Sequence, residues 1–282
     1  ALHAQPADYP SKQVRIIVPF VAGGSTDILA RLVGQHLTER WGRQVLIDNR
    51  PGANGVIAAD FTAKAAPDGH TLLFVAIGHA INPLLQKNLP YDTERDFTPV
   101  SLAAVLPQIL TVHPSVPAAS VKELITLARA RRLNYATGGV GSSQHLATAL
   151  FGSMAKIELQ HVPYKGGHQG MLDTVAGQVD LMISTILSLT PQIKAGRLRG
   201  LAVTTPKRHP AWPTLPTVAE AGLRGYQSVA WYGLVGPANL PPPVLKKLAG
   251  EVAQIIRLKQ VSENLAAQGA ELQRADQVGD LI

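Results

Sequence analysis

Short apolar runs along the chain alternate with longer stretches in which apolar residues recur every three or four positions. The first run, residues 15 to 18, stops at a proline followed by a glycine pair, and it predicts a short buried strand. The next segment predicts a helix with one apolar face, formed by Ile28, Leu29, Leu32, Val33 and Leu37. We expect Thr26 or Asp27 to cap this helix and the region of Gly42 to end it.

Two further apolar runs, residues 45 to 47 and 72 to 76, predict strands, and residues 54 to 65 between them predict a helix. The first part of the chain is therefore expected to fold as strand, helix, strand, helix, strand. This alternation is typical of a parallel sheet with helices on both faces. In such sheets ligands bind at the carboxyl ends of the strands.

The alternation returns after a long apolar run over residues 100 to 112, which we interpret as a strand crossing between two units. Strands are then expected over residues 133–137, 159–162, 180–183 and 198–204, and helices over residues 120–131, from about residue 143, and over 168–176. A strand over 229–235 would cross back, and three prolines at 241–243 would open a last helix.

The sequence thus predicts an α/β fold in which two doubly wound α/β domains are joined by crossing strands. Domain I comprises residues 1–100 and 226–282, domain II comprises residues 101–225, and a ligand cleft lies between them.

Composition narrows the classes of protein. The chain has 282 residues and no cysteine, which excludes disulfide scaffolds and thiolate metal sites. A hydrophobic fraction of 46% argues against intrinsic disorder. Its 26 Lys and Arg against 19 Asp and Glu give a net charge of +7, which favours an anionic partner but does not choose between nucleic acid, a membrane surface and a small acid.

Neither end of the chain nor any internal run predicts a membrane span, since no apolar run approaches the roughly 20 residues that a span needs. The first eight residues are small and irregular. Two interpretations stay open for them: a mature terminus left by signal-peptide cleavage, or a frayed cytosolic terminus.

Two glycine-rich loops occupy matching positions in the two halves. Residues 19–27 (PFVAGGSTD) and 137–145 (TGGVGSSQH) each lie between a predicted strand and a predicted helix. Glycines let backbone amides approach a ligand, and a helix N-terminus favours an anion through its free N–H groups and its dipole. Either loop alone could be an ordinary turn. Their symmetric placement favours an anion, such as a carboxylate, held between two domains.

Motifs for other kinds of site are weak or missing. Residues 139–141 begin like a dinucleotide fingerprint, but Gln144 stands at its third glycine position. The sequence contains no phosphate-binding loop, no nucleophile elbow and no H-E-x-x-H, so Ser25, Ser142, His79 and His145 do not assemble into a hydrolase triad. No nucleic-acid-binding motif occurs either.

Several longer motifs, in order from about Tyr9 to Gln273, resemble those of a known receptor family. They are Pro19 to Asp27, Asp48 to Ala53, Ala65 to Gly69, Tyr135 to His145, Val162 to Gly166 and Pro216 to Gly222. They are similar to the signatures of the Bug receptors, also called the TctC family, which are periplasmic solute-binding proteins of tripartite tricarboxylate transporters. The resemblance is specific to the family and not to one ligand.

The resemblance implies a Venus flytrap of the periplasmic binding protein type. Such a protein would close on a small carboxylate, a mono- or dicarboxylic acid with an aliphatic or aromatic body, and deliver it to membrane permease subunits. It implies a periplasmic monomer with no enzymatic activity, no cofactor and no metal, and we expect no nucleic-acid partner.

The resemblance also implies a set of ligand-binding residues. From the first glycine loop they are Phe20, Ala22, Gly24, Ser25, Thr26 and Asp27, and from the second Gly138, Gly139, Val140, Gly141, Ser142 and His145. The end of the third strand adds Gly78 and His79, with Ala76 and Ile77 beside them, and the opposite wall adds Tyr164, Lys165, Gly166 and Gly167. Asp180 is expected to order a loop rather than to contact the ligand.

One position departs from the family pattern. After Gly177 to Met182 the family commonly continues with Phe-Asp, whereas this chain has Ile183-Ser184. An acid there could pair with a ligand amine, but Ser184 offers only a hydroxyl. We therefore expect a simple carboxylate rather than an amino acid, unless this position only supports a loop.

Two other functions stay open on the residues alone. An enzyme acting on a carboxylic acid could use the same cleft, with His79, His145 or Asp27 as its base. A sensor that passes ligand occupancy to a signalling partner would share the cleft and differ only in what recognises its closure.

Overall fold

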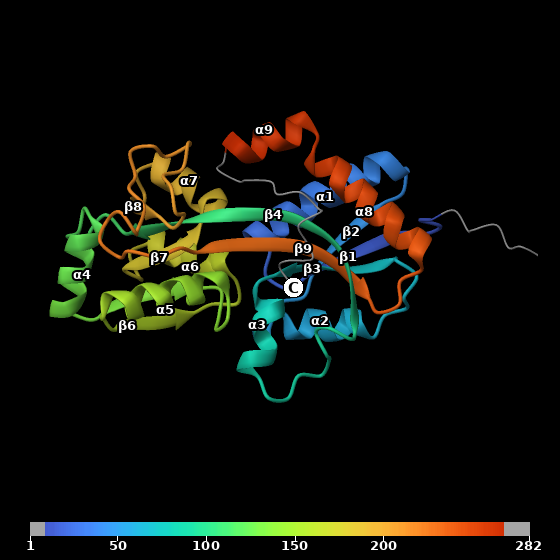
Figure 1. The fold of residues 1–282 in the computed structure, drawn as a ribbon, viewed down its shortest axis with the longest axis horizontal. Coiled ribbons are helices and arrows are strands. Elements are labelled where there is room, and N and C mark those ends of the chain that lie inside the picture. The colour runs from blue at the N-terminus through green and yellow to red at the C-terminus, as the bar shows by residue number, and fades with distance from the viewer. Residues whose placement is uncertain (1–8, 268–282) are drawn as a thin grey trace, which may run out of the picture.

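The computed structural model describes residues 9–267, which form two α/β lobes connected by two long strands (Figure 1). The predictions for residues 1–8, and for the part of domain I beyond residue 267, lie outside the described residues. Among the described residues no helix combines the length and the apolar character that crossing a bilayer requires.

The first lobe is built on three parallel strands, as the apolar runs predict. They are β1 (Val14–Val18), β2 (Val45–Asn49) and β3 (Thr71–Ala76), with β1 in the centre. The helices around them are α1 (Ser25–Trp41), α2 (Val56–Ala63, preceded by a 3-10 turn over Ala53–Gly55), α3 (Gly78–Leu85), α8 (Pro242–Ile256) and α9 (Lys259–Ala267). Leu29, Val33 and Leu37 of α1 are buried in a core shared with α8, as their spacing predicts.

The predicted cap of α1 is wrong. Gly24 occupies the N-cap position in an extended conformation, and no side chain caps the helix. Thr26 and Asp27 lie inside the first turn instead. The C-terminal end is as predicted, because Gly42 adopts the left-handed conformation with φ of 60° that commonly ends a helix.

The second lobe repeats the arrangement. Its strands are β5 (Leu133–Thr137), β6 (Leu159–Pro163), β7 (Leu181–Thr185) and β8 (Arg199–Val203), of which β6 and β7 run parallel to β5. Its helices are α4 (Val121–Ala130), α5 (Ser143–Ala155), α6 (Gly167–Val175) and α7 (Ile186–Lys194). The main apolar core of this lobe, which includes Leu110, Phe151 and Tyr226, is separate from that of the first lobe.

The two connecting strands are β4 (Phe97–Val112) and β9 (Val229–Pro237), which lie side by side across the molecule in Figure 1. They are antiparallel to each other, and β9 also pairs antiparallel with β3. Up to Pro107, β4 pairs with β9, and from Gln108 it pairs with β7 and β8 of the second lobe. The sheets are therefore mixed rather than purely parallel. The domain boundaries at residues 100 and 225 stay a prediction.

Candidate functional site

A pocket of about 530 Å³, partly open to solvent, lies between the two lobes. The predicted site residues that line it are Phe20, Gly24, Ser25, Thr26, Ala76, Ile77, Gly78, Gly138, Ser142, Gly167 and Ser184. They come from both glycine loops, from the end of β3, from the start of α6 and from the end of β7. The structure thus brings together predicted residues that are up to 164 positions apart in the sequence, from Phe20 to Ser184.

Five of the described helices begin beside this pocket. The residues at their starts that line it are Gly24 for α1, Ile77 for α3, Ser142 for α5, Gly167 for α6 and Ser184 with Ser188 for α7. A helix N-terminus presents unpaired N–H groups and about half a positive charge. The sequence predicts two such helix ends, and the fold supplies five.

Four of these helix ends have no side-chain cap. The N-cap residues of α1 and α6 are Gly24 and Gly166, which have no side chain, and that of α3 is Ile77, which has no polar group. Thr185 at the N-cap of α7 could accept a helix N–H but does not. Only α5 is capped, since Ser142 Oγ accepts the N–H of His145 at 3.3 Å. Amides at the other four ends are left for a ligand or water.

The pocket holds no cationic side chain that is permanently charged. Within the described part of the chain, neither lysine nor arginine lines it. Its lining includes the apolar side chains of Phe20, Val21, Ala76 and Ile77. An anion here would be held by amides and dipoles, with an apolar wall for the rest of the molecule.

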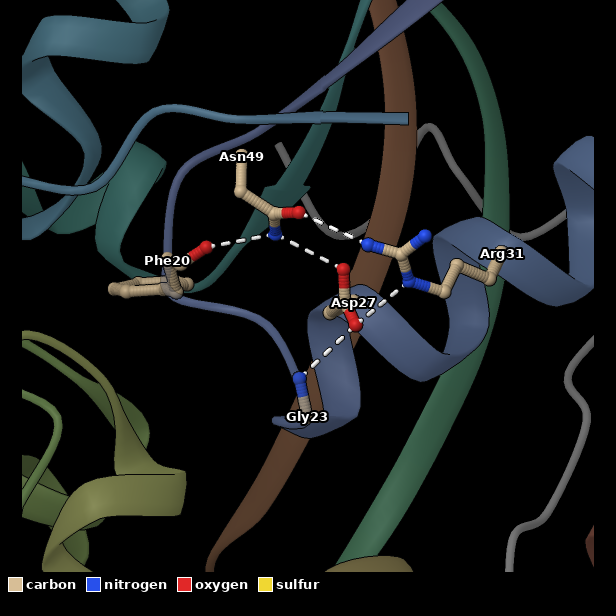
Figure 2. A network of polar contacts seen from close by, with 5 residues as sticks. All are labelled: Phe20, Gly23, Asp27, Arg31 and Asn49. Carbon is tan, nitrogen blue, oxygen red and sulfur yellow. Dashed lines mark hydrogen bonds and ion pairs between the residues drawn. The ribbon is translucent and has the colours of Figure 1, made fainter. Parts of the chain in front are cut away.

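The shape of the first glycine loop is fixed by the carboxylate of Asp27 (Figure 2). Asp27 Oδ2 accepts the N–H of Gly23 at 3.0 Å and Nε of Arg31 at 2.9 Å, while Oδ1 accepts Nδ2 of Asn49 at 2.9 Å. The same Asn49 nitrogen donates to the carbonyl of Phe20 at 3.0 Å. Asp27 thus holds Gly23 directly and Phe20 through Asn49, and Asp27 itself does not line the pocket.

These bonds set the charge state of Asp27. Burial alone would raise the pKa of this carboxyl, but the hydrogen bonds from Arg31, Gly23 and Asn49 outweigh it and hold the pKa below its ordinary value of 3.8. Asp27 is therefore a carboxylate that supports the loop. A general base takes a proton from a bound molecule. The geometry of Asp27 does not favour this role.

Replacing Asp27 by asparagine is expected to lower the free energy of unfolding by about 2 kcal/mol, because a buried charge-assisted network is lost. The wild-type advantage should be full above pH 3.8 and disappear as the pH falls through the lower pKa of the folded carboxyl. Urea unfolding at pH 6 and pH 3 measures both effects. Arg31→Met, which removes the half-exposed partner, should cost less than about 1 kcal/mol. Equal losses in the two variants would contradict this account.

The second glycine loop is held by its own polar groups. Ser142 Oγ donates to the carbonyl of Gly139 at 2.7 Å while capping α5, and Nδ1 of His145 accepts the N–H of Gly141 at 3.3 Å. The rings of His145 and His161 lie 4.6 Å apart. Burial lowers the pKa of His145 and, together with the neighbouring His145, that of His161. His145 thus bonds to the backbone, and it does not line the pocket, so that its contact with a ligand stays a prediction.

Other predicted site residues lie near the pocket but outside it. Gly139, Val140, Tyr164 and Lys165 line a wider and more open space of about 820 Å³, which shares Phe20 and Gly138 with the pocket. His79 lines a third, smaller space of about 250 Å³, where its ring packs against Tyr91 and Phe97. For these residues ligand contact stays a prediction.

The remaining predicted residues, Ala22, Gly141, Gly166 and Asp180, line none of these three spaces. Asp180 lies just before β7, where its carboxylate accepts the N–H of Asn134 at 2.7 Å and so orders a loop. The two glycines lie where the lobes touch. A Cβ on Gly166 would come within 2.7 Å of Val21 Cγ2, and one on Gly141 within 2.8 Å of Leu85 Cδ1.

The pocket also includes residues that were not predicted as ligand contacts, namely Val21, Ser143, Gln144, His168, Ser188 and Tyr232. Val21, Ser143 and Gln144 lie inside the two glycine loops, so including whole loops could have found them. Tyr232 and Ser188 come from β9 and α7, and only the tertiary structure places them at the pocket.

Within residues 9–267, no group of three or more His, Asp or Glu side chains is arranged to hold a metal ion. The residues considered as catalytic bases are also apart from one another. Asp27 supports the first loop, His145 the second, and His79 lies in the third space.

Comparisons with known proteins agree with this architecture. The family model described as "Tripartite tricarboxylate transporter family receptor" matches residues 29–279. The structure of Rpa4515 from R. palustris with adipate is 39% identical, with a TM-score of 0.93 over 97% of this chain and 93% of that one.

Two further solved structures are similar over nearly their whole length. MatC (Rpa3494) from Rhodopseudomonas palustris with bound malate is 33% identical, with a TM-score of 0.90, and covers 95% of this chain and 92% of its own. The periplasmic binding protein BugD is 31% identical, with a TM-score of 0.92, and covers 97% of this chain and 94% of its own.

These matches confirm the predicted resemblance and the fold of the Venus flytrap type. Proteins of this family are periplasmic solute-binding receptors rather than enzymes. The chain belongs to the receptors of the tripartite tricarboxylate transporters, the TctC family to which the Bug proteins also belong.

Proposed function

We propose that this protein binds a small carboxylate in the pocket between its lobes and delivers it, as a periplasmic monomer, to the membrane subunits of a tripartite tricarboxylate transporter. The observation that carries the proposal is the convergence of four helix N-termini without side-chain caps on a pocket that no lysine or arginine lines.

The electrostatics of such a pocket suit a carboxylate. Each helix N-terminus stabilises a nearby negative charge by about 0.3–1 kcal/mol, so four ends together contribute on the order of 1–4 kcal/mol. Amide donors form charge-assisted hydrogen bonds with carboxylate oxygens, and these bonds are about twice as strong as neutral ones. Exclusion of water by closure of the lobes would strengthen them further.

The rest of the ligand would lie against the apolar wall. Phe20, Val21 and Ile77 offer surface for an aliphatic or aromatic body. The structures of two relatives, named for adipate and malate, support an acid with a short carbon chain. The wider space beside Phe20 and Gly138, which includes Lys165, leaves room for a second carboxylate.

The test is a titration with mono- and dicarboxylates, with the matching primary amides as uncharged controls. Acids that bind should raise the melting temperature, because a ligand at a hundred times its Kd adds about 2.7 kcal/mol of stability. The amides should leave it unchanged. Mass spectrometry should recover each bound acid unaltered, as expected for a receptor. Failure of every acid in a broad set to bind, or conversion of a bound acid, would contradict the proposal.

A further inference from the structure

A chain of hydroxyl groups crosses from one lobe to the other at the pocket. Ser25 Oγ, at the start of α1 in the first lobe, lies 2.6 Å from Thr185 Oγ1, at the end of β7 in the second lobe. Thr185 Oγ1 lies 3.0 Å from Ser188 Oγ, which also lies 3.3 Å from Ser184 Oγ.

The direction of these bonds follows from counting protons. Ser188 Oγ donates its one proton to the carbonyl of Thr185 at 3.0 Å, since a carbonyl can only accept. In its bond with Thr185 Oγ1, Ser188 is therefore the acceptor and Thr185 the donor. With its own proton given to Ser188, Thr185 can only accept from Ser25. Ser25 therefore donates its proton to Thr185 Oγ1, on the other side of the cleft.

The same count applies to Ser184. Its bond to Ser188 must also be donated by Ser184, and its other partner, Nε2 of Gln144, is a donor at 3.4 Å. Neither Ser25 nor Ser184 therefore keeps a proton for a carboxylate oxygen. The donors left to a ligand carboxylate on these segments are backbone amides.

The hydroxyl of Thr185 bonds to Ser25 rather than capping α7. Thr185 occupies the N-cap of α7, where threonine commonly accepts a helix N–H, but its hydroxyl bonds to Ser25 and Ser188 instead. Thr185 is 1% exposed and Ser25 is 8% exposed, so the bond between them is shielded from water. A hydrogen bond shielded from water is stronger than an exposed one. A buried hydroxyl that loses its hydrogen-bond partner lowers the stability of the arrangement.

We propose that the Ser25–Thr185 hydrogen bond is a latch that stabilises the closed arrangement of the lobes, and that Ser25 acts in binding through this latch rather than as a donor to the ligand. Thr185 and Ser188 are then positioning residues. The effect of the latch on ligand affinity rests on the proposed function, whereas its effect on the closure of the ligand-free protein does not.

The latch predicts a loss of affinity that is independent of the ligand. Thr185→Val removes the hydroxyl at nearly constant volume, and Ser25→Ala removes its partner. Each should weaken binding of every carboxylate about three- to tenfold, the value of one net hydrogen bond. The double variant should bind no more weakly than the poorer single variant, because one shared bond is lost. Thr185→Ser, which keeps the hydroxyl, should bind as the wild type does.

Closure itself can be measured without ligand. The chain has no cysteine, so cysteines introduced by Arg43→Cys and Lys122→Cys would be labelled specifically with spin labels. Both positions are exposed, Arg43 just after the end of α1 and Lys122 on α4. Electron–electron distance measurements should show a larger open population in Thr185→Val than in Thr185→Ser or the unsubstituted labelled protein.

The outcomes separate the proposals. If no carboxylate binds the wild type, the proposed function fails. The distances between the spin labels then decide alone whether the latch stabilises the closed arrangement. A loss of affinity in Ser25→Ala with none in Thr185→Val would overturn the latch and make Ser25 a ligand donor. Additive losses in the double variant, or equal open populations in Thr185→Val and Thr185→Ser, would also overturn it.

Discussion

Replacing Gly24 by aspartate is expected to weaken carboxylate binding at least a hundredfold while leaving the fold intact. The new carboxylate would lie at the N-terminus of α1 inside the pocket, where it would occupy the amides meant for the ligand and repel its charge. Two like charges about 4 Å apart near a protein surface repel by about 4 kcal/mol, which is more than a hundredfold in affinity requires. Calorimetric titration of wild type and variant with the same acid measures the loss.

The fold should tolerate this substitution for reasons visible in the structure. Gly24 has φ of −82° and ψ of 167°, which any residue can adopt, and a Cβ at this position would meet no atom within 4 Å. Aspartate is also a better N-cap than glycine, so the melting temperature should not fall. Gly24→Asn is the matched control, since it adds the same bulk without the charge. If asparagine weakens binding as much as aspartate does, steric block rather than charge explains the loss, and the anion site is in doubt.

Acidification is expected to destabilise the protein by about 3 kcal/mol through His79 alone. Burial against Tyr91 and Phe97 lowers the pKa of His79 to about 4, whereas in the unfolded chain it would titrate near 6.5. Between these values the unfolded state binds one proton that the folded state does not. Stability therefore falls by about 1.4 kcal/mol for each pH unit as the pH drops from 6.5 toward 4.

The variant His79→Phe keeps the aromatic packing and cannot take up the proton. Urea unfolding of both proteins at pH 7.5 and pH 4.5 isolates the His79 contribution, because other titrating groups are common to the two. The wild type should lose about 2–3 kcal/mol more than the variant on acidification. Parallel losses in the two proteins would show that His79 is not buried in its neutral form.

The strands and glycine loops could be predicted because their signals are local. Apolar runs bounded by Gly and Pro mark β1, β3 and β5, and the loops after β1 and β5 fall where the alternation requires them. For two of the helices that begin at the pocket, the sequence contains no comparable local signal. α3 and α7 begin almost directly after β3 and β7, and each contains an internal proline, Pro83 or Pro191, which is usually taken to end a helix.

The roles of individual side chains were harder to predict. The family resemblance places Asp27 among the ligand contacts because it lies in the matching motif of the first glycine loop. In the folded chain it occupies the first turn of α1 and accepts from Gly23, Arg31 and Asn49. Asn49 comes from another strand, so no local pattern could show that the carboxylate is already engaged. The same is true of Thr185 opposite Ser25, 160 positions away.

The construction of the pocket from uncapped helix ends has a consequence for how such a receptor can change over evolution. A main-chain N–H is present whichever side chain a residue carries, so most single substitutions leave the acid-binding groups in place. Side chains such as Phe20, Ile77 or Ser184 can be exchanged without removing them. A protein built in this way can acquire a new carbon skeleton as its cargo, one substitution at a time, while its demand for an acid group is retained throughout.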